Sequence, residues 1–254
     1  MTKSRIELTG QTAIVTGGTR GLGYYIAARL AEAGCDVFVC GRNAPASLPD
    51  GVAFSACDVR NPEKVAAFVN EVALKSGRID IVVNNAGGSP QHDAASASPR
   101  FVEALVGLNL LGPLYMAQAA YPHMAKAKHG CIVNIASVSG VRPSPGTAIY
   151  GAAKAGLLNL TQSLAQEWGK DGIRVNAIIA GLMITENAES TYGDAGAQAK
   201  VGASMPLGRM GTGDDIAGAV LWLCSELAGW VSGARLHVDG GGERPYFLDL
   251  VKGG

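Results

Sequence analysis

The sequence predicts a single α/β domain built on a doubly wound parallel sheet, and three observations support this prediction. Short β-branched apolar runs alternate with longer helical patterns along the whole chain of 254 residues. The runs are continuously apolar, as expected for strands that helices cover on both faces. A glycine-rich turn joins the first run to the first helical segment. We expect one domain over residues 1–254, because no linker, low-complexity stretch or repeat divides the chain.

The first half of the sheet is expected from short apolar runs, which cover residues 13–16, 36–40, 52–56 and 79–83. The first run leads into a helix through Ala33, and Gly34 stands where a capping glycine ends a helix. Asn61, Pro62 and Glu63 combine an N-cap, a first-turn proline and an acidic first turn. These three residues predict the start of the next helix.

The second half repeats the alternation, with strands expected over residues 131–135, 174–179 and 235–238 and helices over residues 148–168 and 212–224. Ser98 and Pro99 open a long helix, which Gly112 and Pro113 are expected to bend. Residues 186–204 break the alternation, and such long insertions are usually lids or disordered loops. We expect residues 186–204 to form a substrate lid and, with the loop 88–97, to line the substrate pocket.

Composition and charge exclude several classes of function. Lys and Arg total 21, as do Asp and Glu, and this zero net charge argues against a general electrostatic grip on nucleic acid or an anionic membrane. No apolar run approaches the roughly 20 residues of a membrane span. The five cysteines lack framework spacing, which is typical of a reducing compartment, so a cytoplasmic protein is expected. The four histidines show no metal-ligand spacing, and we predict no metal site.

The glycine-rich turn, residues 16–23, has the spacing G-x-x-x-G-x-G. Glycines permit the unusual dihedral angles of such a turn and let a pyrophosphate approach bare N–H groups at the positive end of a helix. The candidate cofactor contacts are Gly17, Thr19, Arg20, Gly21, Leu22 and Gly23. A glycine turn without a ligand is the alternative interpretation.

The end of the second strand indicates which dinucleotide binds. An NAD site usually has Asp or Glu there, on the ribose 2′-hydroxyl. This chain has Arg42 and no carboxylate, and Arg20 lies in the glycine turn. A guanidinium suits a 2′-phosphate, so NADP(H) is expected in preference to NAD(H). Alternatively, both arginines are simply exposed without a partner.

Tyr150 and Lys154 are four residues apart on the predicted helix 148–168 and so share one face. A free tyrosine has a pKa of about 10, and a neighbouring ammonium favours the phenolate, which would make Tyr150 a usable acid or base. Ser137 and Ser139 follow the fifth strand directly, and a serine there can hydrogen-bond a substrate carbonyl. The alternatives are an ordinary Tyr/Lys helix pair and capping or turn serines.

In this order along residues 8–242, the motifs resemble the classical short-chain dehydrogenase/reductase family, which has a Rossmann-like fold. The resemblance is carried by the glycine turn 16–23, Asp58-Val59, Asn84-Asn85-Ala86-Gly87, Asn109, Ser137, Tyr150, Lys154, the segment 211–223 and Val238-Asp239-Gly240-Gly241. Each motif alone is weak, whereas the ordered set is specific.

The resemblance implies a role for each matched residue. Tyr150 would donate a proton to a ketone oxygen or accept one from an alcohol, and Ser137 would polarise that oxygen. Lys154 would hold the nicotinamide ribose and lower the Tyr150 pKa, and Asn109 would fix a water that links Lys154 to solvent. Cofactor contacts would come from Tyr150 and Lys154 themselves and from Asp58, Val59, Asn85, Ala86, Gly87, Gly181, Met183 and Thr185. Ala180 departs from the family pattern, which has proline before Gly181, and leaves the backbone before the lid freer.

The sequence therefore predicts an NADP(H)-dependent oxidoreductase, a carbonyl reductase or the reverse alcohol dehydrogenase, that acts on a small ketone or alcohol. A neutral ketone is favoured, because no cationic cluster stands out near the lid. The alternatives are an NAD-dependent alcohol dehydrogenase of a catabolic pathway and a non-catalytic dinucleotide-sensing protein. The resemblance implies a homodimer or homotetramer, and the apolar tail 245–248 is expected at the interface or over a neighbour's lid.

Overall fold

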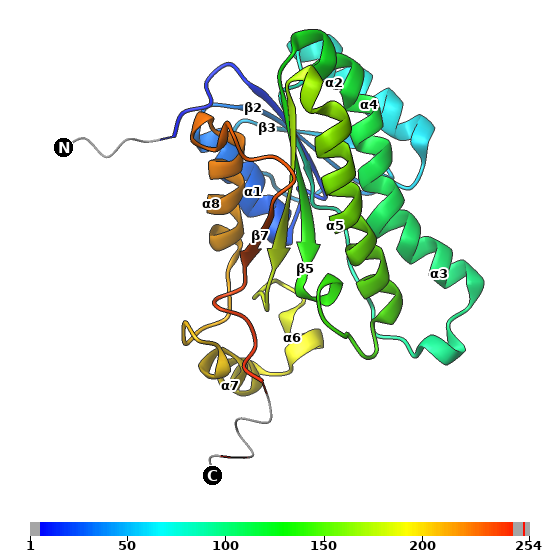
Figure 1. Cartoon of the computed structure of the whole chain (residues 1–254), viewed down its shortest axis with the longest axis vertical. Helices are drawn as coiled ribbons and strands as arrows, with labels where there is room; N and C mark the ends of the chain where they lie inside the picture. The colour runs from blue at the N-terminus through cyan, green and yellow to red at the C-terminus, as the bar shows by residue number, and fades with distance from the viewer. Residues whose placement is uncertain (1–5, 246–250, 252–254) are drawn as a thin grey trace, which may run out of the picture.

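The computed structural model describes residues 6–245 and residue 251. Its sheet contains seven parallel strands in the order β3-β2-β1-β4-β5-β6-β7, as expected of a doubly wound sheet (Figure 1). The strands are β1 (Thr12–Thr16), β2 (Asp36–Gly41), β3 (Val52–Ala56), β4 (Ile81–Asn84), β5 (Gly130–Ser137), β6 (Ile173–Ala180) and β7 (Arg235–Val238). The strand order reverses between β1 and β4, and ligands bind such sheets beyond the carboxyl ends at that point.

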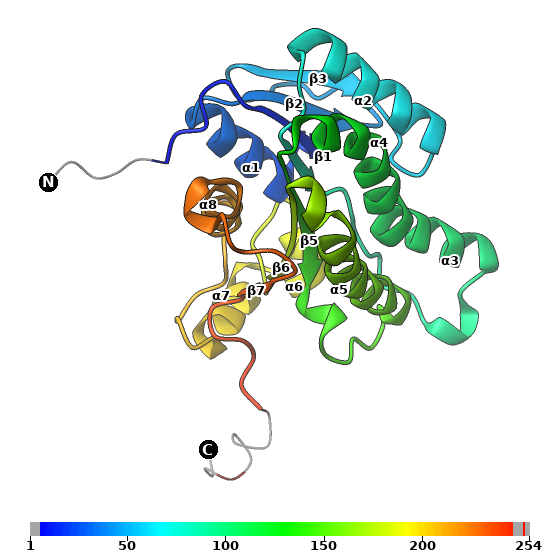
Figure 2. The ribbon, with the colours of Figure 1, turned by 45° about the horizontal axis from the view of Figure 1, so that its top comes forward.

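Helices cover both faces of the sheet (Figures 1 and 2). The helices are α1 (Gly21–Glu32), α2 (Pro62–Ser76), α3 (Pro99–Val106), α4 (Gly112–Ala127), α5 (Ala148–Trp168), α6 (Ala188–Tyr192), α7 (Ala195–Ser204) and α8 (Gly213–Cys224). Helices α1 and α8 lie on one face, and α2, α4 and α5 lie on the other. Ala13 and Val15 belong to the first of these cores and Ile14 to the second, so β1 is buried on both faces.

The prediction of continuously buried strands is confirmed for the centre of the sheet and wrong for its edges. Every residue of β1 and β4 is buried, whereas β3 has no buried residue and β7 alternates between exposed and half-buried positions. An edge strand has a neighbour on one side only, which explains the exposure. The expected fourth strand is also shorter than predicted, because Ile79 and Asp80 precede β4.

The expected bend near Gly112 and Pro113 takes the form of a π-helical turn over Gly107–Leu111, between α3 and α4. The Gly112 N–H donates to the Gly107 carbonyl five residues earlier. Proline has no N–H to donate, which disfavours the ordinary α-helical bonding pattern at this point. The turn places Asn109 in the protein interior, with 0% of its surface exposed.

The segment 186–204 is ordered as two short helices, α6 and α7, at the carboxyl end of the sheet (Figure 1). The Asp194 side chain caps α7 by accepting a hydrogen bond from the Ala197 N–H at 2.9 Å. Ala180 does not interrupt β6, which pairs with β5 and β7 up to this residue. Most of the apolar tail 245–248 lies outside the described residues. Among the helices of the described part, none is long and apolar enough to cross a membrane.

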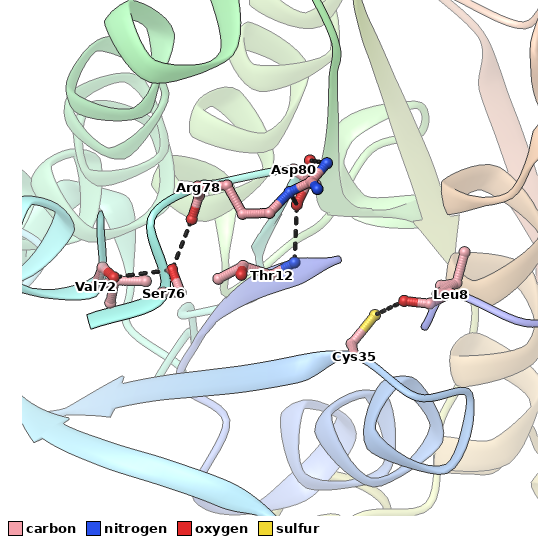
Figure 3. Close-up of polar contacts among 7 residues, drawn as sticks. All are labelled: Leu8, Thr12, Cys35, Val72, Ser76, Arg78 and Asp80. Carbon is pink, nitrogen blue, oxygen red and sulfur yellow. Dashed lines mark hydrogen bonds and ion pairs between the residues drawn. The ribbon is translucent and has the colours of Figure 1, made fainter. Parts of the chain in front are cut away.

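Asp80 joins the amino ends of three strands, and Figure 3 shows its side-chain contacts with Thr12 and Arg78. Its buried carboxylate accepts hydrogen bonds from the Thr12 N–H at 2.8 Å and from the Arg78 guanidinium at 2.7 Å. The Asp80 N–H donates to the Thr12 carbonyl at 3.0 Å, and the Asp80 carbonyl accepts from the Cys131 N–H at 2.8 Å. Asp80 thereby holds the starts of β1, β4 and β5 together, at the end of the sheet opposite the ligand edge.

We expect Asp80→Ala to lower the free energy of unfolding by about 2–4 kcal/mol, because it leaves the Thr12 N–H without its partner in the interior. Urea unfolding followed by circular dichroism measures this change. Asp50→Ala, at an exposed position, is the matched control and should change stability by no more than about 0.5 kcal/mol. Equal stabilities of the two variants would contradict the role given to Asp80.

Candidate active site

A cavity of about 1380 Å³ lies at the carboxyl ends of the central strands. Its wall contains the predicted site residues Gly17, Thr19, Arg20, Gly21, Leu22, Arg42, Asp58, Val59, Asn85, Ala86, Gly87, Tyr150, Lys154, Gly181, Met183 and Thr185. Three predicted site residues do not line this cavity, namely Gly23, Ser137 and Asn109. The structure therefore brings motifs from most of the chain's length to one place.

The glycine turn between β1 and α1 requires its glycines. Gly21 has a φ of +54°, in the left-handed region that other residues rarely adopt. A Cβ on Gly23 would lie 2.3 Å from the Gly17 carbonyl oxygen, so any side chain there would push helix and turn apart. Gly23 thus acts through packing of α1 on the turn.

The amino end of α1 is suited to an anion. Arg20 precedes the helix in an extended conformation without a side-chain cap, and the first turn has no acidic residue. The first N–H groups of a helix have no partner within it, and this end carries partial positive charge. A pyrophosphate fits this donor set. In the structure, the Gly21 N–H donates to a carboxylate oxygen of Glu186 at 3.0 Å.

Asp58 forms an ion pair with Arg60, a residue that the sequence analysis did not identify. Arg60 donates to the two carboxylate oxygens of Asp58 at 2.9 and 2.6 Å. These hydrogen bonds lower the pKa of the Asp58 carboxyl, and the nearby charge of Arg42 lowers it further. Arg20 and Arg42 are exposed in the wall of the same cavity, so this end is rich in positive charge.

Hydrogen bonds fix the residues after β4 beside the glycine turn. The Thr16 hydroxyl accepts from the N–H of Asn85 at 3.0 Å and of Ala86 at 2.9 Å. The Asn85 side-chain amide donates to the carbonyls of Thr16 at 3.0 Å and Gly17 at 3.2 Å. The ends of β1 and β4 are thereby joined at the point where the strand order reverses.

Tyr150 and Lys154 lie on α5, and their side chains meet as the four-residue spacing predicts. The Lys154 ammonium is 5.7 Å from the centre of the Tyr150 ring and donates to the Ile135 carbonyl at 2.7 Å. The Ser137 hydroxyl lies within hydrogen-bonding reach of the Tyr150 phenol and acts to lower its pKa. A Cβ on Gly151 would lie 2.7 Å from the Ser139 carbonyl oxygen. Glycine at this position lets the loop after β5 approach α5 closely enough to bring Ser137 to Tyr150.

Burial perturbs both ionisable groups of this pair. The pKa of the Tyr150 phenol is raised by burial, whereas its hydrogen bond with Ser137 acts in the opposite direction. Burial lowers the pKa of Lys154 from 10.5 to about 8, because the interior disfavours the charged ammonium. The expected lowering of the Tyr150 pKa by Lys154 stays a prediction for the protein with its cofactor bound.

Asn109 lies beside Lys154 at the back of the cavity. Its side chain donates to the carbonyls of Leu105 and Gly88, each at 3.0 Å, and accepts from the Gly88 N–H at 3.2 Å. A Cβ on Gly87 would be 2.9 Å from the Asn109 oxygen and 3.4 Å from the Lys154 nitrogen. Asn109 and Lys154 therefore meet at Gly87, and the expected water site remains a prediction.

A chain of buried polar side chains behind the site was missed from the sequence. The Asn84 amide donates to Asn134 at 2.8 Å, Asn134 donates to the Thr161 hydroxyl at 2.9 Å, and Thr161 donates to the Leu157 carbonyl at 2.7 Å. This chain ties β4 and β5 to α5, the helix that carries Tyr150. The available signal was one asparagine inside the apolar run 131–135, Asn134, and one directly after the run 79–83, Asn84.

The substrate end of the cavity was also only partly predicted. It contains Arg142, which forms an ion pair with Glu243, and Tyr192 of α6. Ser144 bonds to Ser139 at 3.0 Å. The Ser89 hydroxyl is buried in this wall without a hydrogen-bond partner among the described residues, as expected of a group that meets a ligand. Groups that could form a metal-binding cluster of three or more do not occur within the described ranges.

Comparison with known proteins agrees with this geometry. A family model described as enoyl-(acyl carrier protein) reductase, of the short-chain dehydrogenase/reductase type, matches residues 17–243. The chain belongs to the short-chain dehydrogenase/reductase family. Members of this family are oxidoreductases that use nicotinamide dinucleotide cofactors.

Three similar proteins illustrate the range of this family. The 4-formylbenzenesulfonate dehydrogenase of Comamonas testosteroni is 37% identical over 93% of this chain and 99% of that protein. The 3-oxoacyl-[acyl-carrier-protein] reductase of Chlamydia muridarum is 37% identical over 92% of this chain and 98% of that protein. The solved structure of a candidate short-chain alcohol dehydrogenase from Sinorhizobium meliloti has a TM-score of 0.86 and 36% identity, over 93% of this chain and 97% of that one.

We expect the buried Lys154 to make the stability of this short-chain dehydrogenase/reductase depend on pH in a defined direction. Between pH 8 and 10.5 the unfolded chain holds a proton that the folded protein has released, so stability rises with pH. Lys154→Met lacks this proton. From pH 8 to pH 10.5, the free energy of unfolding of the wild type should therefore increase relative to that of Lys154→Met. The increase should be at most about 1.4 kcal/mol per pH unit.

Urea unfolding of both proteins at a series of pH values measures the difference. Lys126→Met, at an exposed position on α4, is the control and should run parallel to the wild type. A constant gap between wild type and Lys154→Met from about pH 7 to about pH 10 would show that the ammonium is not desolvated.

Proposed function

We propose that the protein is an NADP(H)-dependent oxidoreductase that interconverts a ketone and a secondary alcohol, with Tyr150 as the acid or base. One observation carries the proposal, namely that Tyr150 lies beside the buried Lys154 in the wall of the cavity that begins at the amino end of α1, with the Ser137 hydroxyl close enough to act on the Tyr150 pKa. This arrangement combines a proton donor, a hydroxyl that can polarise an oxygen, and a site for a dinucleotide.

The chain's own residues position the reaction and move one proton. The dinucleotide, when bound, supplies or accepts the hydride. In the reducing direction Tyr150 donates its phenolic proton to the substrate oxygen, and Ser137 stabilises the negative charge that develops there. Lys154 holds the nicotinamide ribose, and its charge favours the phenolate that is left behind. In the oxidising direction the same proton returns to Tyr150.

The choice of NADP(H) rests on positive charge at the adenosine end. Arg20 and Arg42 are exposed in the cavity wall, and the stretch after β2 has no carboxylate. The carboxylate of Asp58 is already neutralised by Arg60. Arg20 and Arg42 form no ion pair within the part of the chain that the structure describes, and an unpaired guanidinium is suited to the 2′-phosphate of NADP(H).

The substrate end favours a neutral carbonyl compound. The charge of Arg142 is balanced by Glu243, and the remaining groups of this wall include the hydroxyls of Ser89, Ser139 and Tyr192. The two curated relatives are named for a formyl and an oxo compound with different anionic or carrier groups, so their names support carbonyl chemistry without selecting one substrate. Residues 186–204, which contribute Tyr192, serve as the lid in this proposal.

We expect Tyr150→Phe to reduce kcat by about 100-fold or more with a ketone and NADPH, because the phenylalanine has no proton to transfer. The dissociation constant of NADPH should stay within about threefold, since the ring is retained. Absorbance of NADPH and a fluorescence titration measure the two quantities. Tyr25→Phe, on the exposed side of α1, is the control. Full turnover by Tyr150→Phe would refute the mechanism.

We expect Arg42→Ala to weaken NADPH binding by about tenfold and NADH binding by less than about twofold, because only NADPH carries the 2′-phosphate. Titration of the protein with each reduced cofactor tests this difference. Arg100→Ala removes the same charge at an exposed position outside the cavity and should bind both cofactors as the wild type does. Tighter binding of NADH than of NADPH by the wild type would overturn the cofactor assignment.

A further inference from the structure

Glu186, the first residue of the lid, lines the cavity and is hydrogen-bonded to the amino end of α1. One oxygen of its carboxylate accepts the Gly21 N–H at 3.0 Å, from a position 165 residues further along the chain. The other oxygen would be 3.5 Å from a Cβ on Gly21. Both oxygens of the carboxylate therefore lie at the first turn of α1.

This carboxylate has the chemistry of the ligand expected at the same place. The first turn of α1 has no side-chain cap from Arg20 and no acidic residue of its own. A free N–H at the positive end of a helix attracts an oxyanion, whether it belongs to a carboxylate or a phosphate. Glu186 and a pyrophosphate would require the same Gly21 N–H, so the two cannot bind it at the same time.

The backbone immediately before Glu186 is fixed, which confines any movement to the lid. Met183 forms a parallel bridge with Gly211, the Ile184 N–H donates to the Gly211 carbonyl at 2.8 Å, and the Gly211 N–H donates to Leu182 at 2.9 Å. Helix α6 begins at Ala188, whose N–H bonds to Thr185 at 2.9 Å. Residues after Ile184 can thus move while residues 182–184 stay attached to the fold.

We propose that Glu186 is an internal anion that latches the lid onto the cofactor site, and that the pyrophosphate of the dinucleotide must displace it. This inference rests on the proposed function, because it needs a dinucleotide at α1. The contact couples cofactor binding to release of the segment that carries Tyr192 into the cavity wall. The lid is then free to close over a substrate only after the cofactor is in place.

The relative strengths with which Glu186 and a pyrophosphate bind the amino end of α1 decide which of the two occupies it. Glu186 carries one charge and makes one exposed hydrogen bond to α1. A pyrophosphate carries two charges and accepts from several N–H groups of the turn, so it wins the competition. The latch therefore weakens cofactor binding by a modest factor and does not prevent it.

The test compares Glu186→Gln and Glu189→Gln, which remove the same charge from neighbouring positions of the lid. Glu189 is exposed and is not part of the cavity wall. Titration of the cofactor-free proteins with NADPH should give a dissociation constant about three- to tenfold lower for Glu186→Gln than for the wild type. Glu189→Gln should match the wild type.

Hydrogen exchange of the cofactor-free proteins gives a readout that does not depend on activity. The Gly21 amide and residues 186–192 should exchange faster in Glu186→Gln than in wild type or Glu189→Gln, because a neutral amide oxygen holds the Gly21 N–H less strongly than the carboxylate does. Unchanged exchange would overturn the latch.

The binding outcomes separate the two proposals. Equal or weaker NADPH binding by Glu186→Gln overturns the inference alone, because the carboxylate then does not compete with the cofactor. Failure of all three proteins to bind NADPH or NADH overturns the proposed function and the inference with it.

Discussion

The hydroxyl of Thr16 sets the geometry on which the rest of the site depends. By accepting the N–H groups of Asn85 and Ala86, it joins the carboxyl ends of β1 and β4 where the strand order reverses. The glycine turn leaves β1 at this joint, and Gly87 leaves β4 next to it. Asn109 and Lys154 both lie against Gly87. One side-chain oxygen thus fixes the amino end of α1 relative to Asn109 and Lys154.

The centre of the site holds two groups whose charges the interior opposes. Lys154 has a lowered pKa and Tyr150 a raised one, because burial favours the neutral form of each. The carbonyl of Ile135 accepts the hydrogen bond that keeps the Lys154 ammonium in place, and the nearby Ser137 hydroxyl acts to lower the Tyr150 pKa. Strongly perturbed groups gather at functional sites. The raised pKa keeps the Tyr150 phenol protonated, as a proton donor requires, whereas the Lys154 pKa of about 8 lies near neutral pH.

Local sequence patterns predicted those features that local chemistry determines. The spacing of Tyr150 and Lys154 fixes a shared helix face, and the glycine turn fixes a strand-to-helix joint. Edge strands and the beginning of β4 were less well predicted, because neighbours in the sheet decide exposure and pairing. The contacts of Arg60 with Asp58 and of Glu186 with Gly21 depend on which side chains the whole fold brings together. No local pattern carries that information.

The π-helical turn between α3 and α4 has a geometric consequence for the whole catalytic face. Each residue of an α-helix advances the chain by about 100° around the axis, so the wider turn changes which way the flanking helices point relative to one uninterrupted rod. Removing a single amino acid here would restore a regular spiral and swing α3, with everything it touches, to a different side of α4. The position of Asn109 at the back of the site therefore depends on this π-helical turn, which a regular α-helix would lack.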